Sequence, residues 1–311
     1  MSKIAFIFPG QGAQYAGMGR DFYENFAESK EIFERASQLL GMNMKELVFE
    51  ENEKLNRTEY TQVAMVTTMA AMLAHIHTLG IQPEVCAGLS LGEYAALIES
   101  KVLNVDDAIL LVRKRGIYMQ EAVPVGVGGM AAVLGMDPEV VEDICSKASG
   151  IVSVANYNCP GQVVISGENT ALQYAITSLE QAGAKRVLPL NVSGPFHSSM
   201  LEKAGELLRA EIKKIDIHTP QIPYVANVTA NYVTKGGEVE ELLTKQVSSS
   251  VRWQQSVETM IANGIDIFVE IGPGKTLSSF IKKIDKTKKV INIEKVEDLV
   301  NLKELKEVIG C

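Results

Sequence analysis

Short apolar runs and longer stretches of helical periodicity alternate along the first 122 residues. Residues 3–8 and 85–88 are continuous apolar runs flanked by Gly or Pro, which predicts buried strands. Hydrophobic residues at helical spacing predict helices at about 22–40, 60–79, 92–98 and 104–121. Because strands that alternate with helices form parallel sheets covered on both faces, this part of the chain is predicted to be α/β.

A different order of elements follows a stretch rich in Gly and Pro. Residues 123–129 hold three Gly and one Pro, which marks a candidate domain boundary. Beyond it the pattern predicts strand, helix, strand, strand, helix and strand at 130–134, 137–148, 152–156, 162–166, 169–182 and 186–190. This is the split-βαβ, ferredoxin-like order. We therefore expect a small subdomain at 123–192, inserted into a large domain made of 1–122 and 193–311.

The alternation of strands and helices returns beyond residue 191. Strands are predicted at 224–227, 265–271 and 290–293, and helices at about 200–215, 238–246, 253–263 and 275–284, with one more at the C-terminus. The expected fold class is therefore α/β, with a mostly parallel sheet in the large domain and a ferredoxin-like (βαββαβ) insertion.

Composition narrows the class of protein further. The 311 residues are 46% hydrophobic and 22% charged, which suits a large core and not a disordered chain. The net charge of −8 argues against a nucleic-acid partner. Four scattered Cys, none in a C-x-x-C pair, favour a reduced protein in the cytoplasm. The longest apolar stretch, 63–79, contains Thr and His residues and predicts a buried helix, so no membrane partner is expected.

Residues 88–92 read G-x-S-x-G between a predicted strand and a predicted helix. In that context the motif forms a nucleophile elbow, a sharp turn that exposes the Ser hydroxyl above the end of a helix. Ser90 is therefore a candidate nucleophile, and backbone N–H groups at the helix start favour negative charge nearby. The alternative is an ordinary Gly-flanked turn in which Ser90 is a helix N-cap.

A serine needs a base, and the chain has only four His. His75 and His77 lie two residues apart on a predicted helix, so they point to different sides and suit packing roles. His218 lies in a polar connection. His197 directly follows a strand end, where site residues of α/β sheets collect, and is the favoured base over a structural role. No Asp or Glu precedes it closely, so a backbone carbonyl is expected to orient its ring.

Seven motifs along the chain together match the pattern of one family of enzymes. A glycine-rich loop after the first strand lacks the G-x-G-x-x-G spacing of a dinucleotide site and suits an oxyanion-binding loop instead. The matching segments are FPGQGAQ (8–14), GLSLGEY (88–94), RKRGIYMQ (113–120), NCPGQVVISG (158–167), GPFHSSM (194–200), KQVSSSVRW (245–253) and EIGPGKTL (270–277). They cover nearly the whole chain and occur in the order found in the malonyl-CoA:acyl-carrier-protein transacylases, so the chain resembles that family. The resemblance implies a hydrolase-like large domain with a ferredoxin-like insertion.

The resemblance also implies an activity and its residues. The malonyl group of malonyl-CoA would pass through Ser90 to the phosphopantetheine thiol of acyl carrier protein, for fatty acid synthesis. His197 would act as the base. The other implied positions are the backbone N–H groups of Gln11 and Leu91 as oxyanion donors, Arg115 on the malonyl carboxylate, the main chain at Gln246 orienting His197, and Asn158 and Phe196 beside the substrate. No cofactor is expected, because CoA and phosphopantetheine thioesters are substrates, and the protein is expected to be a monomer.

Two features leave alternatives open. The family usually has His before the nucleophile, where this chain has Leu89, which puts in doubt any substrate contact made from that position. Residues 282–289 hold five Lys and one Asp, which is either a solvated surface or a docking patch for an acidic carrier. A hydrolase using the same Ser/His pair and a catalytically idle scaffold are the rival functions.

Overall fold

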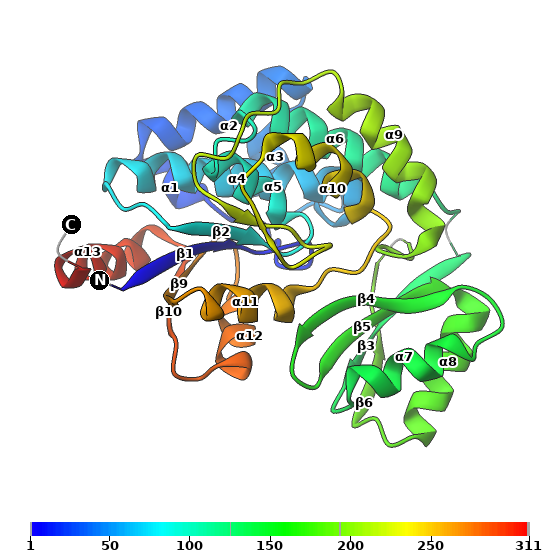
Figure 1. Ribbon diagram of the computed structural model, residues 1–311. Coiled ribbons are helices and arrows are strands. Elements are labelled where there is room, and N and C mark those ends of the chain that lie inside the picture. The colour runs from blue at the N-terminus through cyan, green and yellow to red at the C-terminus, as the bar shows by residue number, and fades with distance from the viewer. Residues whose placement is uncertain (1, 125, 193, 310–311) are drawn as a thin grey trace.

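The computed structural model describes residues 2–124, 126–192 and 194–309 and contains two separate sheets (Figure 1). The first has six strands in the order β10-β9-β1-β2-β7-β8, and all neighbouring pairs are parallel except β7–β8. Its strands are β1 (Lys3–Phe8), β2 (Val85–Gly88), β7 (Tyr224–Val225), β8 (Tyr232–Val233), β9 (Ile265–Ile271) and β10 (Lys289–Ile293). This is the mostly parallel sheet that the sequence predicts.

Helices cover both faces of this sheet, because the side chains of β1 alternate between two cores. Phe6 and Phe8 pack into the larger core, and Ala5 and Ile7 pack into the smaller one. The larger core is shared with α1 (Arg20–Asn25), α2 (Ala27–Leu40), α3 (Met44–Phe49), α4 (Thr58–Thr78), α5 (Gly92–Glu99), α6 (Val105–Glu121), α9 (Glu202–Ile212), α10 (Val239–Gln246) and α13 (Leu299–Ile309). The smaller core is closed by α11 (Trp253–Ala262) and α12 (Thr276–Ile284), on the other side of the sheet in Figure 1.

The second sheet is antiparallel, with strand order β4-β5-β3-β6. Its elements are β3 (Gly128–Leu134), α7 (Pro138–Ser146), β4 (Val152–Cys159), β5 (Gln162–Glu168), α8 (Asn169–Gln181) and β6 (Arg186–Pro189). One face of β3, with Ala131 and Val133, packs on α7 and α8. The opposite face, with Met130 and Ala132, turns toward the first sheet. The ferredoxin-like order of elements is therefore present.

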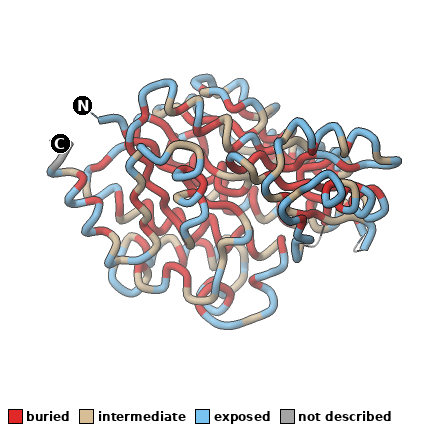
Figure 2. The backbone as a smooth tube through the Cα atoms, turned by 90° about the horizontal axis from the view of Figure 1, so that it is seen from below, coloured by how far each residue is buried: buried red, intermediate tan, exposed pale blue. Residues whose placement is uncertain are grey.

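The two sheets are joined by the segment before α11. Val251 forms a parallel bridge to β4: its N–H donates to the Ala155 oxygen at 2.8 Å, and its oxygen accepts from the Tyr157 N–H at 2.9 Å. The Ser250 hydroxyl adds a bond to the Val154 oxygen. Figure 2 shows buried residues (red) running through both parts of the molecule. Backbone pairing thus fixes the antiparallel sheet to the segment that leads into α11.

The structure differs from the sequence prediction in several places. The predicted helix 22–40 is two helices, because Phe26 is extended (φ −129°, ψ 124°) and its ring stacks on His75 at 3.4 Å between centroids. The predicted helix 200–215 begins with a 3₁₀ turn and ends at Ile212. The strand predicted at 224–227 is only two residues long and turns back as β8, and α3 was not predicted.

The predicted domain limits at 122/123 and 192/193 stay predictions. Val125, in the predicted linker, and Ser193, the predicted first residue of the second large-domain segment, lie outside the described residues, as do Met1 and residues 310–311. Among the helices of the described residues, none combines the length and the apolar character needed to cross a membrane.

Candidate active site

The segment that joins β2 to α5 is a sharp turn with Ser90 at its apex. Ser90 has φ 50°, a conformation that costs energy for a residue other than Gly. A Cβ at Gly88 would lie 2.0 Å from the carbonyl carbon of Gly92, and one at Gly92 would lie 2.1 Å from the Phe8 oxygen. Both positions therefore require Gly. The turn also packs directly against the end of β1, which leads into the glycine-rich loop.

His197 lies beside the Ser90 hydroxyl. Its Nε2 is 2.7 Å from Ser90 Oγ, and its Nδ1 is 2.9 Å from the main-chain oxygen of Gln246. Because a carbonyl oxygen can only accept, Nδ1 carries the proton and Nε2 offers a lone pair to the serine. His197 also has a positive φ of 59°. The predicted pair is brought together, and the predicted backbone acceptor for the histidine is at Gln246.

Burial and charge keep the histidine neutral. Burial is the main cause that lowers the pKa of His197 to about 4, and the nearby Arg115 guanidinium lowers it further. Hydrogen bonds to the main chain of Gln246 and Ser249 oppose this shift. A neutral imidazole at pH 7 is ready to accept a proton from the serine.

Two backbone N–H groups near Ser90 are free to bind an anion. The Ser90 N–H donates to Asn227 Oδ1 at 2.7 Å, and the Gly92 N–H donates to the Leu89 oxygen at 2.9 Å. The N–H groups of Leu91 and Gln11 make no hydrogen bond within the described part of the chain. These are the two oxyanion donors that the resemblance implies, and both residues line the same cavity.

Arg115 is a buried cation held beside the nucleophile. Its side chain is 1% exposed, and it hydrogen-bonds through Nη1 to Gln62 Oε1 at 2.9 Å and through Nη2 to Gln246 Oε1 at 2.9 Å and Ser90 Oγ at 3.2 Å. A guanidinium has five N–H donors, so these bonds leave two. Nε is one of them and has no partner among the described residues. The group can still receive a carboxylate.

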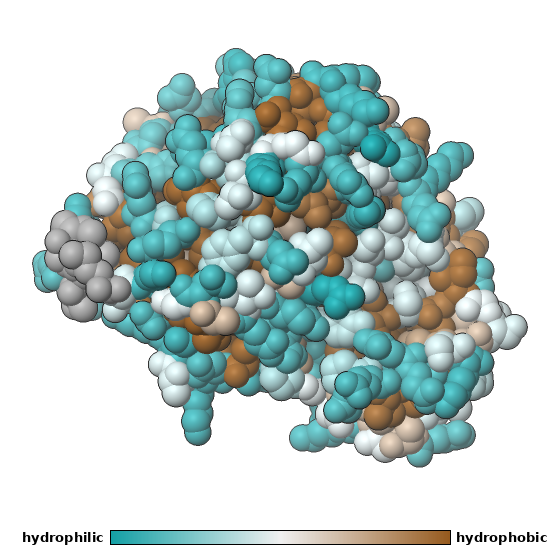
Figure 3. Space-filling view, viewed as in Figure 1, coloured by the Kyte–Doolittle hydropathy of each residue, from teal (hydrophilic) through white to brown (hydrophobic). Residues whose placement is uncertain are grey.

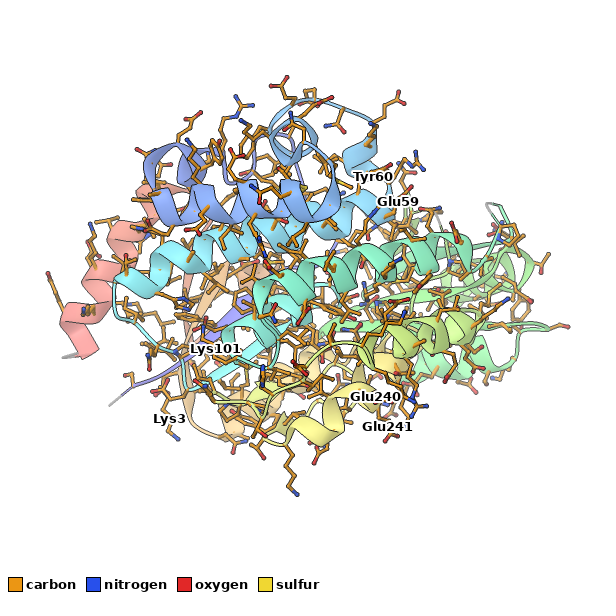
Figure 4. All side chains as sticks on the ribbon, turned by 90° about the horizontal axis from the view of Figure 1, so that it is seen from above. Lys3, Glu59, Tyr60, Lys101, Glu240 and Glu241 are labelled. Carbon is orange, nitrogen blue, oxygen red and sulfur yellow. The ribbon has the colours of Figure 1, made fainter. Side chains whose placement is uncertain are left out.

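Contacts between α4 and α6 hold Arg115 in place. Arg113, two residues earlier on α6, forms an ion pair with Glu59 at 2.9 Å, and its guanidinium lies 4.6 Å from the centre of the Tyr60 ring. Glu59 and Tyr60 are at the start of α4 (Figure 4). The helix that carries Gln62 is thereby fastened to the helix that carries Arg115.

The site opens into a cavity of about 400 Å³ between the two sheets. Hydrophobic side chains are visible where the two parts of the molecule meet in Figure 3. The predicted residues that line the cavity are Gln11, Ser90, Leu91, Arg115, Asn158, Phe196 and His197. Gln246 is not a lining residue, because it lies fully buried behind Ser90 and Arg115. Leu89 also lines the cavity.

Asn158 and Phe196 are both buried at the cavity wall. Asn158 Oδ1 has no hydrogen-bond partner among the described residues, so it is available as an acceptor for a bound molecule. The other histidines lie elsewhere: His75 contacts Glu28 at 2.7 Å, His77 contacts Glu99 at 2.5 Å, and His218 is exposed.

Three polar residues of the site were missed by the sequence analysis. Glu93, Asn227 and Gln62 are buried and hydrogen-bond the elbow, Gln246 or Arg115. Asn227 Nδ2 also donates to the Gly88 oxygen at 2.7 Å. Glu93 lies within the motif that contains Ser90, but nothing in the sequence shows that its side chain turns inward. Gln62 and Asn227 carry no local signal.

An α/β fold with a serine on a strand-to-helix turn, a neutral histidine beside it and a free pair of backbone donors has the features of an acyltransferase. The model of the acyl transferase domain family matches residues 5–302. The malonyl CoA-acyl carrier protein transacylase of Bacillus subtilis (strain 168) is 42% identical over 312 residues, with 99% of this chain and 98% of the relative covered. The enzyme of that name from Staphylococcus aureus (strain MSSA476) is 43% identical, with 96% and 98% covered.

Solved structures agree with these relatives. The malonyl CoA-acyl carrier protein transacylase of Clostridium perfringens is 48% identical with a TM-score of 0.96, and 99% of both chains is covered. A malonyl-transacylase solved in complex with a type II PKS acyl-carrier protein is 37% identical with a TM-score of 0.95, and 97% of this chain and 99% of that chain are covered. The chain belongs to the acyl transferase domain family and, within it, to the malonyl CoA-acyl carrier protein transacylases.

Proposed function

We propose that the protein transfers the malonyl group of malonyl-CoA to the phosphopantetheine thiol of an acyl carrier protein, through a malonyl ester on Ser90. The observation that carries this proposal is the joint contact of one hydroxyl: Ser90 Oγ is 2.7 Å from a neutral histidine nitrogen and 3.2 Å from a buried guanidinium. A base activates the serine, and a cation beside it selects an acyl group that ends in a carboxylate. The names of the relatives support the same donor and acceptor.

In the first half-reaction, Ser90 Oγ attacks the thioester carbon and its proton passes to His197 Nε2. The negative charge on the carbonyl oxygen is stabilised by the N–H groups of Gln11 and Leu91. The carbon–sulfur bond then breaks, and His197 returns the proton to the CoA sulfur. In the second half-reaction the carrier thiol gives its proton to His197 and attacks the ester, and Ser90 regains the proton as the carbon–oxygen bond breaks.

Arg115 gives the acyl specificity in this proposal. When an acyl group occupies Ser90 Oγ, the Nη2–H that donates to this oxygen becomes available. Together with the neighbouring N–H on the same edge of the guanidinium it matches the two oxygens of the malonyl carboxylate, a paired contact that a lysine cannot reproduce. Asn158 and Phe196 would bound the rest of the substrate, Asn158 as an acceptor and Phe196 as a bulky wall against branched acyl groups. All acid–base and electrostatic functions fall to the protein's own groups, so no cofactor is proposed.

The carrier protein would dock beside the mouth of the cavity, on the lysines in the last turn of α12 and in the segment that follows it. Leu277 and Phe280 of α12 line the cavity, and Lys283 donates to Gln162, another lining residue, at 3.2 Å. Lys282, Lys283, Lys286 and Lys289 are exposed. An acidic carrier would be attracted to this patch although the whole chain is acidic. We propose that the protein works as a monomer in the cytoplasm, where its cysteines stay reduced.

Steady-state kinetics test the two-step mechanism. Initial rates are measured while malonyl-CoA and holo-carrier protein are both varied. Parallel double-reciprocal lines are expected, because CoA leaves before the carrier binds, and intersecting lines would refute the acyl-enzyme. The same assay measures free malonate. Malonate release faster than transfer would identify a hydrolase, and the absence of both activities would favour the idle scaffold.

A further inference from the structure

A buried carboxylate that the proposed chemistry does not use lies beneath the elbow. Glu93, the second residue of α5, is 1% exposed. Its Oε2 accepts a hydrogen bond from Gln246 Nε2 at 2.8 Å and one from the Asn227 N–H at 3.3 Å. Burial raises the pKa of Glu93 to about 7, while these two bonds and the charge of Arg115 oppose the rise. A carboxylate in such a place is costly to bury.

The side-chain amide of Gln246 lies between Glu93 and Arg115. Its Oε1 accepts from Arg115 Nη2 at 2.9 Å, and its Nε2 donates to Glu93 Oε2 and to the Ser90 oxygen, both at 2.8 Å. A flipped amide would direct its NH₂ at the guanidinium and its oxygen at two acceptors, and would lose all three bonds. The cation on one side and the carboxylate on the other therefore require the same orientation of the amide.

We propose that Glu93 is a positioning residue that, by fixing the Gln246 amide, directs the Arg115 guanidinium toward the carboxylate of the acyl group. This inference rests on the proposed function, since it assigns Glu93 to the selectivity of that same site. Among the described residues, Arg115 is hydrogen-bonded by Gln62 and Gln246 besides the serine itself, and the Tyr94 ring lies 5.4 Å from its guanidinium. A rotated Gln246 would remove one of these two anchors and leave the guanidinium free to turn away.

The position of Glu93 also allows a purely structural role. By accepting from the Asn227 N–H it ties α5 to the chain after β7, and its loss would then weaken the whole elbow. If Glu93 has this structural role, its loss lowers the rate of every acyl transfer equally. If Glu93 positions Arg115, its loss lowers the transfer of acyl groups that carry a carboxylate and leaves the transfer of other acyl groups unchanged.

Glu93→Gln tests the positioning role, because it keeps the size of the side chain and removes its charge. A neutral amide beside Gln246 can present either a donor or an acceptor and so no longer fixes the orientation. Glu99→Gln is the matched control: Glu99 is equally buried on the same helix but contacts His77, outside the cavity. For each full-length variant, kcat/KM is measured with malonyl-CoA and with acetyl-CoA, together with the melting temperature.

Glu93→Gln is expected to lower kcat/KM for malonyl-CoA about tenfold or more, the effect of losing one charge-assisted hydrogen bond. Acetyl transfer is expected to change less than about threefold, and Glu99→Gln should leave the malonyl-to-acetyl ratio unchanged. In an Arg115→Ala background, Glu93→Gln should no longer change the ratio, because its effect passes through Arg115. An unchanged ratio in Glu93→Gln itself would overturn the proposal.

The unmodified enzyme gives a second readout that does not depend on the folding of a variant. As the pH falls through about 7, Glu93 becomes protonated and the ratio of malonyl to acetyl transfer should fall. The charged or titratable groups near Glu93 are Arg115 on α6, whose guanidinium stays charged in proteins, and Tyr94 on α5 and Tyr224 on β7, whose pKa values burial raises above the ordinary value for tyrosine. Burial lowers the pKa of His197 to about 4. A ratio that stays constant across this range would contradict the proposal. A wild-type enzyme that transfers no malonyl group would instead refute the proposed function.

Discussion

Nδ1 of His197 donates a hydrogen bond to the main-chain oxygen of Gln246 at 2.9 Å, at the place where many serine enzymes have a carboxylate. A carbonyl orients the ring and fixes its tautomer, but it adds no negative charge to stabilise an imidazolium. Burial and the Arg115 cation both destabilise the imidazolium, so the pKa of His197 falls to about 4. The dyad of Ser90 and His197 is therefore a neutral pair, and this has a direct consequence for the pH dependence of the reaction.

Acylation should stay independent of pH down to unusually acidic values. His197 acts as a base only when neutral, and with a pKa of about 4 it is neutral at every pH above that value. The groups that face its ring are the Ser90 hydroxyl, the Arg115 guanidinium and the main chain of Gln246 and Ser249. We expect kcat/KM for acetyl-CoA to be flat from neutrality to about pH 5 and to fall below it.

Acetyl-CoA is the donor for this profile because it has no carboxylate and avoids the contribution of Arg115. Circular dichroism at each pH separates titration of the base from acid unfolding. An inflection near 6.5, the ordinary value for histidine, would show that burial does not hold the imidazole neutral.

Removing the guanidinium should separate malonyl from acetyl transfer. Arg115→Ala is expected to lower kcat/KM for malonyl-CoA by a hundredfold or more, since losing a buried charge pair costs about 2–5 kcal/mol. Acetyl transfer should fall much less. Arg115→Lys should not restore malonyl transfer, because an ammonium cannot bond two carboxylate oxygens in parallel. Equal losses of kcat/KM with both donors would show that Arg115 does not bind the malonyl carboxylate.

Asn227 should matter although it lies outside every motif. Asn227→Ala leaves the Ser90 N–H and the Gly88 oxygen of the elbow without partners, which costs about 1–3 kcal/mol for each buried group. We expect a lower melting temperature and a lower kcat with both acyl donors. Asn263→Ala is the control, because that side chain bonds the Thr259 oxygen at an exposed helix end and no other partner among the residues that the structure describes. If Asn227→Ala behaves like the control, the elbow does not depend on this side chain.

Substitutions in the lysine patch should weaken the binding of the carrier protein and leave the binding of malonyl-CoA unchanged. Reversing two charges in Lys283→Glu/Lys286→Glu is expected to raise the KM for holo-carrier protein several-fold and to weaken its dependence on salt, with the KM for malonyl-CoA unchanged. Lys303→Glu, an exposed lysine on α13, provides the control. An unchanged KM for the carrier in the double variant would place docking elsewhere.

The fold was largely readable from the sequence because its elements have strong local signals. β1, β2 and β9 begin and end at the predicted residues, and Asn104 caps α6 through the Asp107 N–H. The break at Phe26 was not readable, because the extended residue is held by its ring contact with His75, a residue far along the chain. Tertiary contact there outweighs helical periodicity.

The residues of the site also fall into two groups, those that local sequence indicates and those that it does not. Ser90 directly follows β2 and stands in a short motif, so local sequence indicates it. His197 was predicted to follow a strand end of the α/β sheet directly, but the strand before it, β6, ends at Pro189 and belongs to the antiparallel sheet. Arg115, Gln11 and Leu91 needed the family resemblance. Asn227 hydrogen-bonds Ser90, which lies 137 residues away in the sequence, and Glu93 hydrogen-bonds Gln246, which lies 153 residues away. Bonds of that kind depend on how distant segments are packed, so they become visible only in three dimensions.

The acyl-enzyme itself is the most direct test of the account. The protein is mixed with malonyl-CoA in the absence of carrier protein, quenched in acid, digested, and its peptides are analysed by mass spectrometry. One malonyl group is expected, on the peptide that contains Ser90. It should disappear when holo-carrier protein is added before the quench, and it should be absent in Ser90→Ala. A malonyl group on another residue, or an unlabelled Ser90 while transfer to the carrier proceeds, would contradict the account.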